Sequence, residues 1–186
     1  MSVRIIAGQW RARKLDTPAG DTTRPTADRT RETLFSMLIS RLGRFEGLAV
    51  ADLFAGSGAL GLEALSRGAA SCVFVEQDPA AIRALRGNIA NLQAAPQCDV
   101  RAASVLALGP AKAPLDLVLL DPPYQTGAGE VALDKLQRLG WIGPATWISL
   151  ETAYNELPKV KGLEMAADRK VGKARITLLR MEPASA

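Results

Sequence analysis

The chain of 186 residues contains no histidine and only two cysteines. The absence of histidine excludes Ser-His and Cys-His nucleophile pairs, histidine general bases and nearly all common zinc sites. Two cysteines cannot complete a four-cysteine zinc site. Carboxylates could formally hold Mg²⁺, but no dense acidic cluster in the sequence argues for it. We therefore expect no metal site.

Long apolar runs are also missing, since no uninterrupted stretch approaches the ~20 residues that a membrane span needs. The first ten residues lack the apolar segment and small-residue cleavage site of a secretory signal. These features predict a cytoplasmic protein with no membrane partner. Cys72 and Cys98 lie in segments typical of strands, so we expect two reduced, buried thiols.

Basic residues are unevenly distributed. Residues 1–44 hold nine Lys and Arg against four acids, a surplus of five, whereas the whole chain carries a net charge of +4. We therefore divide the chain into a basic arm and helix at 1–44 and a main domain at 45–186. Such a surplus is typical of a protein that binds RNA or DNA; the alternative is a solvated basic face. With a second basic group near the other end, the candidate RNA-binding residues are Arg4, Arg11, Arg13, Lys14, Arg24, Arg29, Arg169, Lys170 and Lys173.

The pattern of apolar residues predicts an α/β fold. A hairpin or extended arm at 3–15 and a helix at 26–42 come first. Strand patterns then follow at 48–54, 71–76, 100–103, 115–120 and 146–151, alternating with helical patterns at 59–66, 79–92 and 129–139. Two further strands, 163–166 and 176–181, are expected to pair antiparallel around Gly172. This alternation predicts a mostly parallel seven-stranded sheet with helices on both faces.

The tetrapeptide Asp121-Pro122-Pro123-Tyr124, which we call the proline ledge, directly follows the apolar run at 115–120. Open α/β sheets bind ligands at the carboxyl ends of their strands, so this is a position where a catalytic site is expected. The prolines fix two φ angles and remove two N–H donors, which leaves a stiff ledge with a carboxylate, free carbonyls and an aromatic ring. A planar base with an exocyclic amine would fit it. The alternative is that the prolines only end a strand.

The first strand-to-helix junction carries a glycine loop. Gly56, Gly58 and Gly61 form a G-x-G-x-x-G, which lets the backbone turn tightly and approach a nucleoside. Glu76, at the end of the next strand, could bind a ribose in either a dinucleotide or an S-adenosylmethionine enzyme. Asp52 precedes the glycines and suits a ligand with a cationic amino-acid tail better than a pyrophosphate. Together with the proline ledge it favours S-adenosylmethionine; the alternative is that the glycines are only turn residues.

These segments together resemble the RsmD family, bacterial methyltransferases that modify the N2 amine of a guanine in small-subunit (16S) ribosomal RNA with S-adenosylmethionine. The resemblance covers most of the chain and is carried by residues 5–8, 23–35 and 52–69, by Glu76 and by the ledge at 121–124. The ledge is shared with other amino-methyltransferases, whereas its combination with the two N-terminal segments is more specific. The resemblance implies a Rossmann-like class I methyltransferase fold with an N-terminal hairpin and helix extension.

The resemblance also implies the site residues. S-adenosylmethionine, with S-adenosylhomocysteine as its product, is expected at Asp52, Phe54, Ala55, Gly56, Ser57, Gly58, Glu76, Gln77, Ser104, Val105 and Asp121. Methyltransferases often place an acid or amide after the third strand to read the adenine; this chain has Ala103-Ser104-Val105, so Ser104 or a backbone group is expected to do it. The helix with Arg29, Arg31 and Glu32 is expected to close over the cofactor.

The expected catalytic residues are Asp121, Pro122, Pro123 and Tyr124. A guanine amine is a poor nucleophile because its lone pair is delocalised into the ring. We assign Asp121 and the Pro122 carbonyl as acceptors for its two N–H bonds, and Tyr124 as the ring that stacks on the flipped base.

Two other functions stay open. A DNA or RNA adenine-N6 methyltransferase shares the ledge but usually needs a target-recognition segment, for which residues 125–186 are too short and too regular. A non-enzymatic RNA-binding module is disfavoured because the glycine loop and the ledge are both intact. The resemblance implies a monomer that acts on ribosomal RNA within a partly assembled small subunit.

Overall fold

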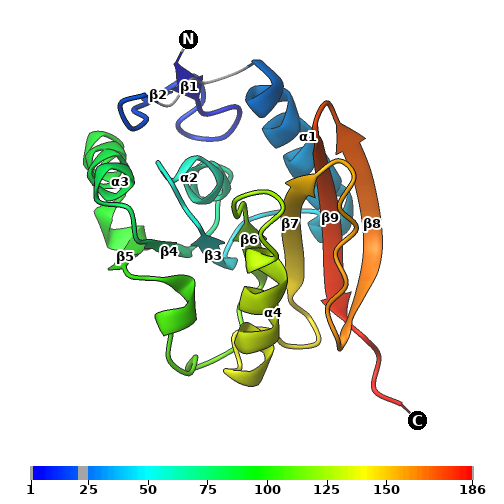
Figure 1. The fold of residues 1–186 in the computed structure, drawn as a ribbon. Coiled ribbons are helices and arrows are strands. Elements are labelled where there is room, and N and C mark those ends of the chain that lie inside the picture. Colours follow the sequence, from blue (N-terminus) through cyan, green and yellow to red (C-terminus); the bar gives the residue numbers. More distant parts are fainter. Residues whose placement is uncertain (1, 21–24, 186) are drawn as a thin grey trace.

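The computed structural model describes residues 2–20 and 25–185 (Figure 1). A short antiparallel hairpin of β1 (Val3–Arg4) and β2 (Lys14–Leu15) is followed by α1 (Pro25–Leu42). The main part contains β3 (Ala49–Leu53), α2 (Ala59–Ser66), β4 (Ser71–Glu76), α3 (Pro79–Asn91), β5 (Cys98–Ala102), β6 (Leu117–Leu120), α4 (Ala128–Arg138), β7 (Trp147–Ala153), β8 (Leu163–Val171) and β9 (Ala174–Met181). The predicted α/β fold class is confirmed.

The central sheet has the strand order β5-β4-β3-β6-β7-β9-β8. The five strands from β5 to β7 are parallel, and β9 runs antiparallel between β7 and β8. The chain moves outward from β3 through β4 to β5 and then returns to β6 on the other side of β3. Such a reversal opens a crevice at the carboxyl ends of the two central strands. The glycine loop follows β3 and the proline ledge follows β6, so both predicted motifs flank this crevice.

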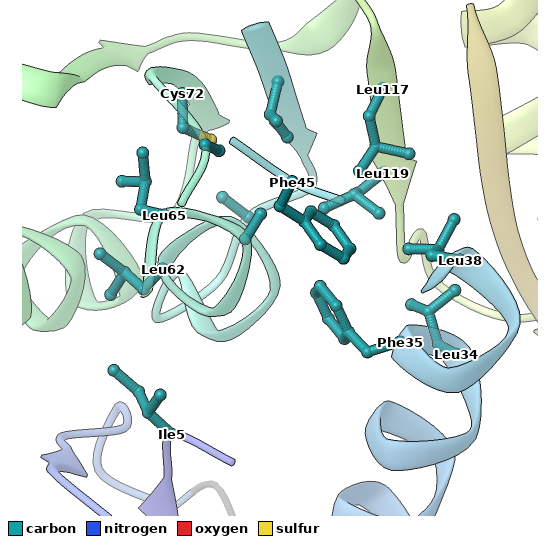
Figure 2. Packing of buried hydrophobic residues seen from close by; sticks show 14 of the residues in the cluster. Ile5, Leu34, Phe35, Leu38, Phe45, Leu62, Leu65, Cys72, Leu117 and Leu119 are labelled. Atoms are coloured by element: carbon teal, nitrogen blue, oxygen red, sulfur yellow. The ribbon is translucent and has the colours of Figure 1, made fainter. Parts of the chain in front are cut away.

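Helices cover both faces of the sheet (Figure 1). One hydrophobic core packs α1, α2 and α3 against one face, and a second packs α4 against the other. Figure 2 shows the first core, where Phe35 of α1 and Phe45 approach with ring centroids 5.7 Å apart and planes tilted by 37°. On α1, Phe35 and Leu38 are buried in this core, whereas Ile39 is 43% exposed.

The N-terminal hairpin is docked onto α2. The carboxylate of Glu63, which is fully buried, accepts hydrogen bonds from the backbone N–H groups of Ile6 and Ala7 at 2.8 and 3.0 Å. Gly8 lies so close to the end of this helix that a Cβ there would stand 1.9 Å from the carbonyl oxygen of Ser66. Hairpin, α1 and sheet share one core. The division at residues 44 and 45 stays a prediction.

The predicted helix at 59–66 and the predicted strand at 71–76 match α2 and β4, and the other boundaries differ by at most two residues except in β8. Its sequence pattern predicts an end at Ala166, whereas the strand continues to Val171. The added residues, which include Asp168, Arg169 and Lys170, are too polar to signal a strand, but each pairs with β9 across an irregularity between Met165 and Ala167. Antiparallel pairing at an edge leaves such side chains exposed, so the polar sequence is tolerated.

Cys72 and Cys98 are free thiols, paired in register on β4 and β5. Cys72 is buried as expected, whereas Cys98 is only half-buried because β5 is the edge strand of the sheet. Burial raises the pKa of both thiols, that of Cys98 to about 11. Within the described residues, no helix is long and apolar enough to cross a membrane.

Candidate active site

A cavity of about 470 Å³ lies at the carboxyl ends of β3, β4 and β6 and beside the segment that follows β5. This ligand cavity is lined by Phe54, Val75, Glu76, Gln77, Ala103, Ser104, Val105, Asp121, Pro122 and Pro123. Residues from four separate segments of the predicted site thus meet in one place. The volume is in the range of small-molecule sites.

Glu76 ties the ligand cavity to the glycine loop. Its Oε1 accepts a hydrogen bond of 2.8 Å from the backbone N–H of Gly56, and its Oε2 accepts two of 2.8 Å from the N–H groups of Gln77 and Asp78. Phe54, at the start of the loop, has a φ of +59°, a strained conformation for a residue with a side chain. The carboxylate is therefore held rigidly at the cavity wall, next to a strained turn.

The glycines of the loop have different roles. A Cβ at Gly58 would lie 2.4 Å from a methyl group of Leu85, and one at Gly61 would lie 2.4 Å from the ring of Phe74. Gly58 therefore allows the start of α2 to lie close to α3, and Gly61 allows α2 to pack closely against β4. Gly56 has open space around its Cβ position and a φ of +57°, so its requirement is the backbone turn.

Asp52 is buried, with 1% of its surface exposed, and is not among the residues lining the ligand cavity. Its Oδ2 accepts a hydrogen bond of 2.9 Å from the N–H of Gly61. Burial raises the pKa of Asp52 to about 8; the Gly61 hydrogen bond opposes this, and the charge of Glu76 adds to it. The Asp52 side chain therefore stabilises the glycine loop from inside the fold. Its contact with the cofactor stays a prediction.

Ala55 and Ser57, which were also predicted to bind the cofactor, are not among the residues lining the ligand cavity. Ala55 is buried, its N–H bonded to the carbonyl of Val75, and the Ser57 carbonyl accepts from the amide of Asn88. Ser104 lines the cavity, and its hydroxyl accepts a hydrogen bond of 3.2 Å from the N–H of Leu106.

The proline ledge spans two recesses. Asp121, Pro122 and Pro123 line the ligand cavity, whereas Tyr124 does not. Tyr124 lines an adjoining side recess, which shares both prolines with the cavity and is completed by Gly127, Ala128, Gly129, Glu130, Leu150, Glu151, Thr152 and Glu156. The prolines thus form a wall between a nucleoside-sized cavity and an aromatic ring that is 41% exposed.

Three acids that were not predicted from the sequence line the side recess, and two of them, Glu151 and Glu156, bind the chain at the ledge. The Tyr124 hydroxyl donates a hydrogen bond of 2.6 Å to Oε1 of Glu151, and the N–H of Gln125 donates one of 2.8 Å to Oε1 of Glu156. The sequence could have indicated Glu151, because it directly follows the apolar run of β7. The carboxyl ends of the neighbouring parallel strands, which carry the other site residues, lie at the same end of the sheet.

The acids at the ledge perturb one another. Loss of solvation, with the charge of Glu151 next, raises the pKa of Asp121, and loss of solvation also raises that of Glu151. Loss of solvation and the hydrogen bond to Glu151 raise the pKa of Tyr124. Asp121 is exposed at the wall of the ligand cavity.

Both recesses are lined by acids. Among the described residues, no Lys or Arg lines either of them, whereas the walls include Glu76, Asp121, Glu130, Glu151 and Glu156. Such a field disfavours a pyrophosphate and favours a cation. Within the same part of the chain, no group of three Cys, Asp or Glu side chains could hold a metal ion.

The predicted RNA-binding residues fall into two groups, apart from Arg24, which lies outside the described residues. Arg169, Lys170 and Lys173 are exposed around the β8–β9 turn. Ala153 at the end of β7 pairs with Ala174, so this turn lies at the same sheet edge as the ledge. The group at the other end of the chain comprises the exposed residues Arg4, Arg11, Arg13, Lys14 and Arg29 on the hairpin and α1.

Two hairpin arginines have structural partners. Arg4 donates to the Ala12 carbonyl and Arg13 to the Asn91 carbonyl, both at 2.8 Å. On α1, Arg31 is buried and donates to the Arg4 carbonyl at 2.6 Å. Arg31 is not among the residues lining the ligand cavity, nor are Arg29 and Glu32, so the expected closure of α1 over the cofactor stays a prediction.

Comparison with known proteins agrees with this architecture. The family model described as Conserved hypothetical protein 95 matches residues 3–180. The chain is 42% identical over 159 residues to ribosomal RNA small subunit methyltransferase D of Escherichia coli (strain K12), covering 85% of this chain and 79% of that protein. It is 41% identical to the protein of the same name from Haemophilus influenzae, covering 81% of this chain and 78% of that one.

Solved structures give the same result. A putative methyltransferase from Escherichia coli matches with a TM-score of 0.85 and 35% identity, over 98% of this chain and 99% of that one. A magnesium protoporphyrin IX methyltransferase from Synechocystis with bound SAM, at 15% identity and a TM-score of 0.64 over 87% of this chain and 86% of that one, shares the fold alone. The chain therefore belongs to the family described as Conserved hypothetical protein 95, the RsmD family of methyltransferases.

Proposed function

We propose that this methyltransferase transfers a methyl group from S-adenosylmethionine to the exocyclic N2 amine of a guanine in small-subunit ribosomal RNA. The observation that carries the proposal is the meeting of Glu76 with Asp121 and Pro122 in one cavity of about 470 Å³. The relatives named as ribosomal RNA small subunit methyltransferases support the RNA substrate.

The residues of the ligand cavity fit S-adenosylmethionine. Glu76 is placed to accept hydrogen bonds from ribose hydroxyls, because Oε1 has one backbone partner and a carboxylate oxygen can accept two. The acid-lined walls suit a sulfonium cation. When bound, S-adenosylmethionine supplies a methyl group on a sulfonium sulfur. Ser104, Val105 and Gln77 line the part of the cavity that follows β4 and β5, where we place the adenine.

Asp121 and Pro122 act on the amine. The Asp121 carboxylate and the Pro122 carbonyl accept hydrogen bonds from the two N–H groups, which draws the nitrogen lone pair out of the ring. As the N–C bond forms with that lone pair, the bond between the methyl carbon and the sulfonium sulfur would break with its electrons left on sulfur. One N–H proton passes to Asp121, and the electrons of that N–H bond stay on nitrogen. The raised pKa of Asp121 makes it a better proton acceptor than an ordinary aspartate.

The guanine must leave its stack to reach the ledge. Tyr124 presents an exposed ring beside Pro123, where a flipped base would stack. The acidic recesses repel phosphates, so the RNA backbone must lie outside them. Arg169, Lys170 and Lys173 provide positive charge at the same sheet edge and are the groups we assign to the backbone. We further propose a monomer in the cytoplasm that acts on a partly assembled small subunit.

An adenine-N6 target is the second candidate, because the ledge itself would accept either amine. Residues 125–186 supply α4 and the strands β7, β8 and β9 of the central sheet. That segment is therefore part of the common fold, and within its described residues we find no added recognition element of the kind used to read adenine sites in DNA. This favours the guanine.

The test is methyl transfer from labelled S-adenosylmethionine to small-subunit RNA, naked and in assembly intermediates, with mass analysis of the nucleosides. We expect N2-methylguanosine. Asp121→Ala should lower kcat by about 10²–10⁴-fold while changing cofactor affinity by less than about tenfold. Asp99→Ala is the matched control, since Asp99 is an exposed acid on β5. N6-methyladenosine as product, or equal loss of turnover and cofactor binding in Asp121→Ala, would contradict the proposal.

A further inference from the structure

Two carboxylates from the end of β7 and the segment after it hold the chain around the proline ledge. Glu151 accepts the hydrogen bond of 2.6 Å from the Tyr124 hydroxyl. Glu156 accepts from the N–H of Gln125 at 2.8 Å and from the N–H of Ala153 at 3.1 Å. Two consecutive ledge-side residues are thus each tied to an acid about thirty positions later in the chain.

The backbone at this point needs such support. Gln125 has a φ of +59°, a conformation that costs free energy for a residue with a side chain. The hydrogen bond from its N–H to Glu156 stabilises this turn. Glu156 therefore stabilises the backbone of this turn, whereas Glu151 binds a side chain of the ledge, that of Tyr124.

Glu151 also lies beside Asp121. Leu120 of β6 is in register with Leu150 of the parallel strand β7, so the residues that follow them, Asp121 and Glu151, are neighbours. Loss of solvation, with the charge of Glu151 next, raises the pKa of Asp121. Carboxylates carry no proton of their own, so a hydrogen bond between them requires that one proton be shared by the pair. Glu151 consequently links the predicted proton acceptor to the predicted stacking ring.

Among the residues that the structure describes, no Lys or Arg faces this pair to neutralise its charge. The ionisable groups of the neighbouring elements are Asp52 on β3, Glu76 on β4, Tyr124, Glu130 on α4 and Glu156. On β9, the residue in register with Glu151 is Ile176. Arg175 is adjacent in sequence but is engaged by Asp168 at 2.8 Å and by the Tyr154 carbonyl at 3.2 Å. A shared proton is the remaining way to lower the repulsion.

We infer that Glu151 is a positioning residue that holds Tyr124 through its hydroxyl and Asp121 through a shared proton, so that the stacking ring and the proton acceptor keep a fixed geometry. This inference rests on the proposed methyl transfer and names a residue that its chemistry requires. The proton released from N2 enters the Asp121–Glu151 pair and leaves it to water.

Three variants test this role. Glu151→Gln keeps the size of the side chain and an oxygen for Tyr124 but removes the charge beside Asp121. Tyr124→Phe keeps the ring and removes the hydroxyl. Glu164→Gln is the matched control, because Glu164 is exposed on β8 in register with Arg180, away from the ledge. Circular dichroism and thermal unfolding confirm that each variant is folded.

Glu151→Gln should lower kcat by roughly ten- to hundredfold, the size expected when a hydrogen bond to a charged group is removed, with the KM for cofactor unchanged. Tyr124→Phe should lower kcat on its own but have a smaller effect in the Glu151→Gln background, because the neutral amide oxygen accepts the hydroxyl hydrogen bond more weakly than the carboxylate, so part of the contact is already lost. Additive effects of the two changes would overturn the claim that Glu151 acts through Tyr124.

The pH dependence supplies a readout that mere structural support would not move. Removing the Glu151 charge lowers the pKa of Asp121, so the acid limb of kcat should shift to lower pH in Glu151→Gln. Carbon-13 NMR titration of the Asp121 carboxyl in the free protein should show the same shift. An unchanged titration would overturn the inference. Failure of the wild-type protein to methylate RNA would instead overturn the proposed function, while the NMR titration still decides whether the proton is shared.

Discussion

The backbone N–H of Gly56 and Oε1 of Glu76, twenty residues apart in the sequence, form a hydrogen bond of 2.8 Å across the ends of β3 and β4. This hydrogen bond joins the glycine loop to the ribose-binding acid that is predicted at the end of the next strand. The same carboxylate accepts from two further N–H groups, so it is an acceptor at every contact.

Replacing Glu76 should therefore damage cofactor binding. In Glu76→Gln one side-chain position becomes an NH₂ donor, which cannot pair with the N–H groups of Gly56, Gln77 or Asp78. We expect affinity for S-adenosylhomocysteine, measured by calorimetry, to fall by at least about tenfold, as for loss of hydrogen bonds to a charged group. Asp99→Asn, an exposed acid on the neighbouring β5, should bind normally. Equal affinity in Glu76→Gln would remove Glu76 from the site.

Asp52 should make stability depend on pH. Its pKa rises from 3.8 in the unfolded chain to about 8 in the folded protein, so the native state binds more protons between these values. Stability from this group is complete below about pH 4 and decreases as the pH rises towards 8, by roughly 1.4 kcal/mol for each unit of pKa difference crossed. Asp52→Asn keeps an acceptor for Gly61 and has no charge to acquire.

Urea unfolding at pH 5, 6.5 and 8 measures how the free energy of unfolding depends on pH. The free energy of unfolding of the wild-type protein should decrease more steeply with pH than that of Asp52→Asn. Asp121 and Glu151 titrate in the same direction and are present in both proteins, so the difference between the two curves reports Asp52 together with the smaller effect of its charge on Asp121. Parallel curves would show that Asp52 is ionised throughout.

Gly8→Ala should detach the N-terminal hairpin from α2. The added Cβ would stand 1.9 Å from the Ser66 carbonyl oxygen, and Gly8 has a φ of +88°. We expect a decrease of about 2–4 kcal/mol in the free energy of unfolding. Gly43→Ala is the control: its φ is +74° and its Cβ would meet no atom within 4 Å, so only the backbone cost of about 1 kcal/mol applies. Similar decreases in the two variants would mean that the hairpin contact contributes little.

The basic residues around the β8–β9 turn should determine salt-dependent RNA binding. Changing Arg169, Lys170 and Lys173 together to Gln should weaken RNA binding and flatten the plot of log K against log salt by about 0.7 for each phosphate that is no longer neutralised. A control removes three exposed charges remote from that turn, at Lys112, Arg138 and Lys161. Filter binding at several salt concentrations compares the two. An equal effect of both sets would indicate that the protein's overall charge, not this surface, attracts RNA.

The local patterns of the sequence were sufficient for the fold and for the position of the ligand cavity. Apolar runs report a buried strand and the 3.6-residue period reports a helix, because each depends on which side chains a single element must bury. The prolines at 122 and 123 constrain their own backbone in any fold. Such features need no knowledge of distant residues, so the elements from α2 to α4 and the site between Glu76 and Asp121 could be predicted.

Contacts between distant residues were decided only by the tertiary structure. Nothing local in the sequence pairs Tyr124 with Glu151, turns Asp52 inward to Gly61, or extends β8 through the polar residues 168–170. These depend on strand order, because the placement of β7 beside β6 and of β9 beside β7 brings their ends together. The sequence determines the chemical groups that the chain carries, but the distance between two side chains depends on how the folded chain packs.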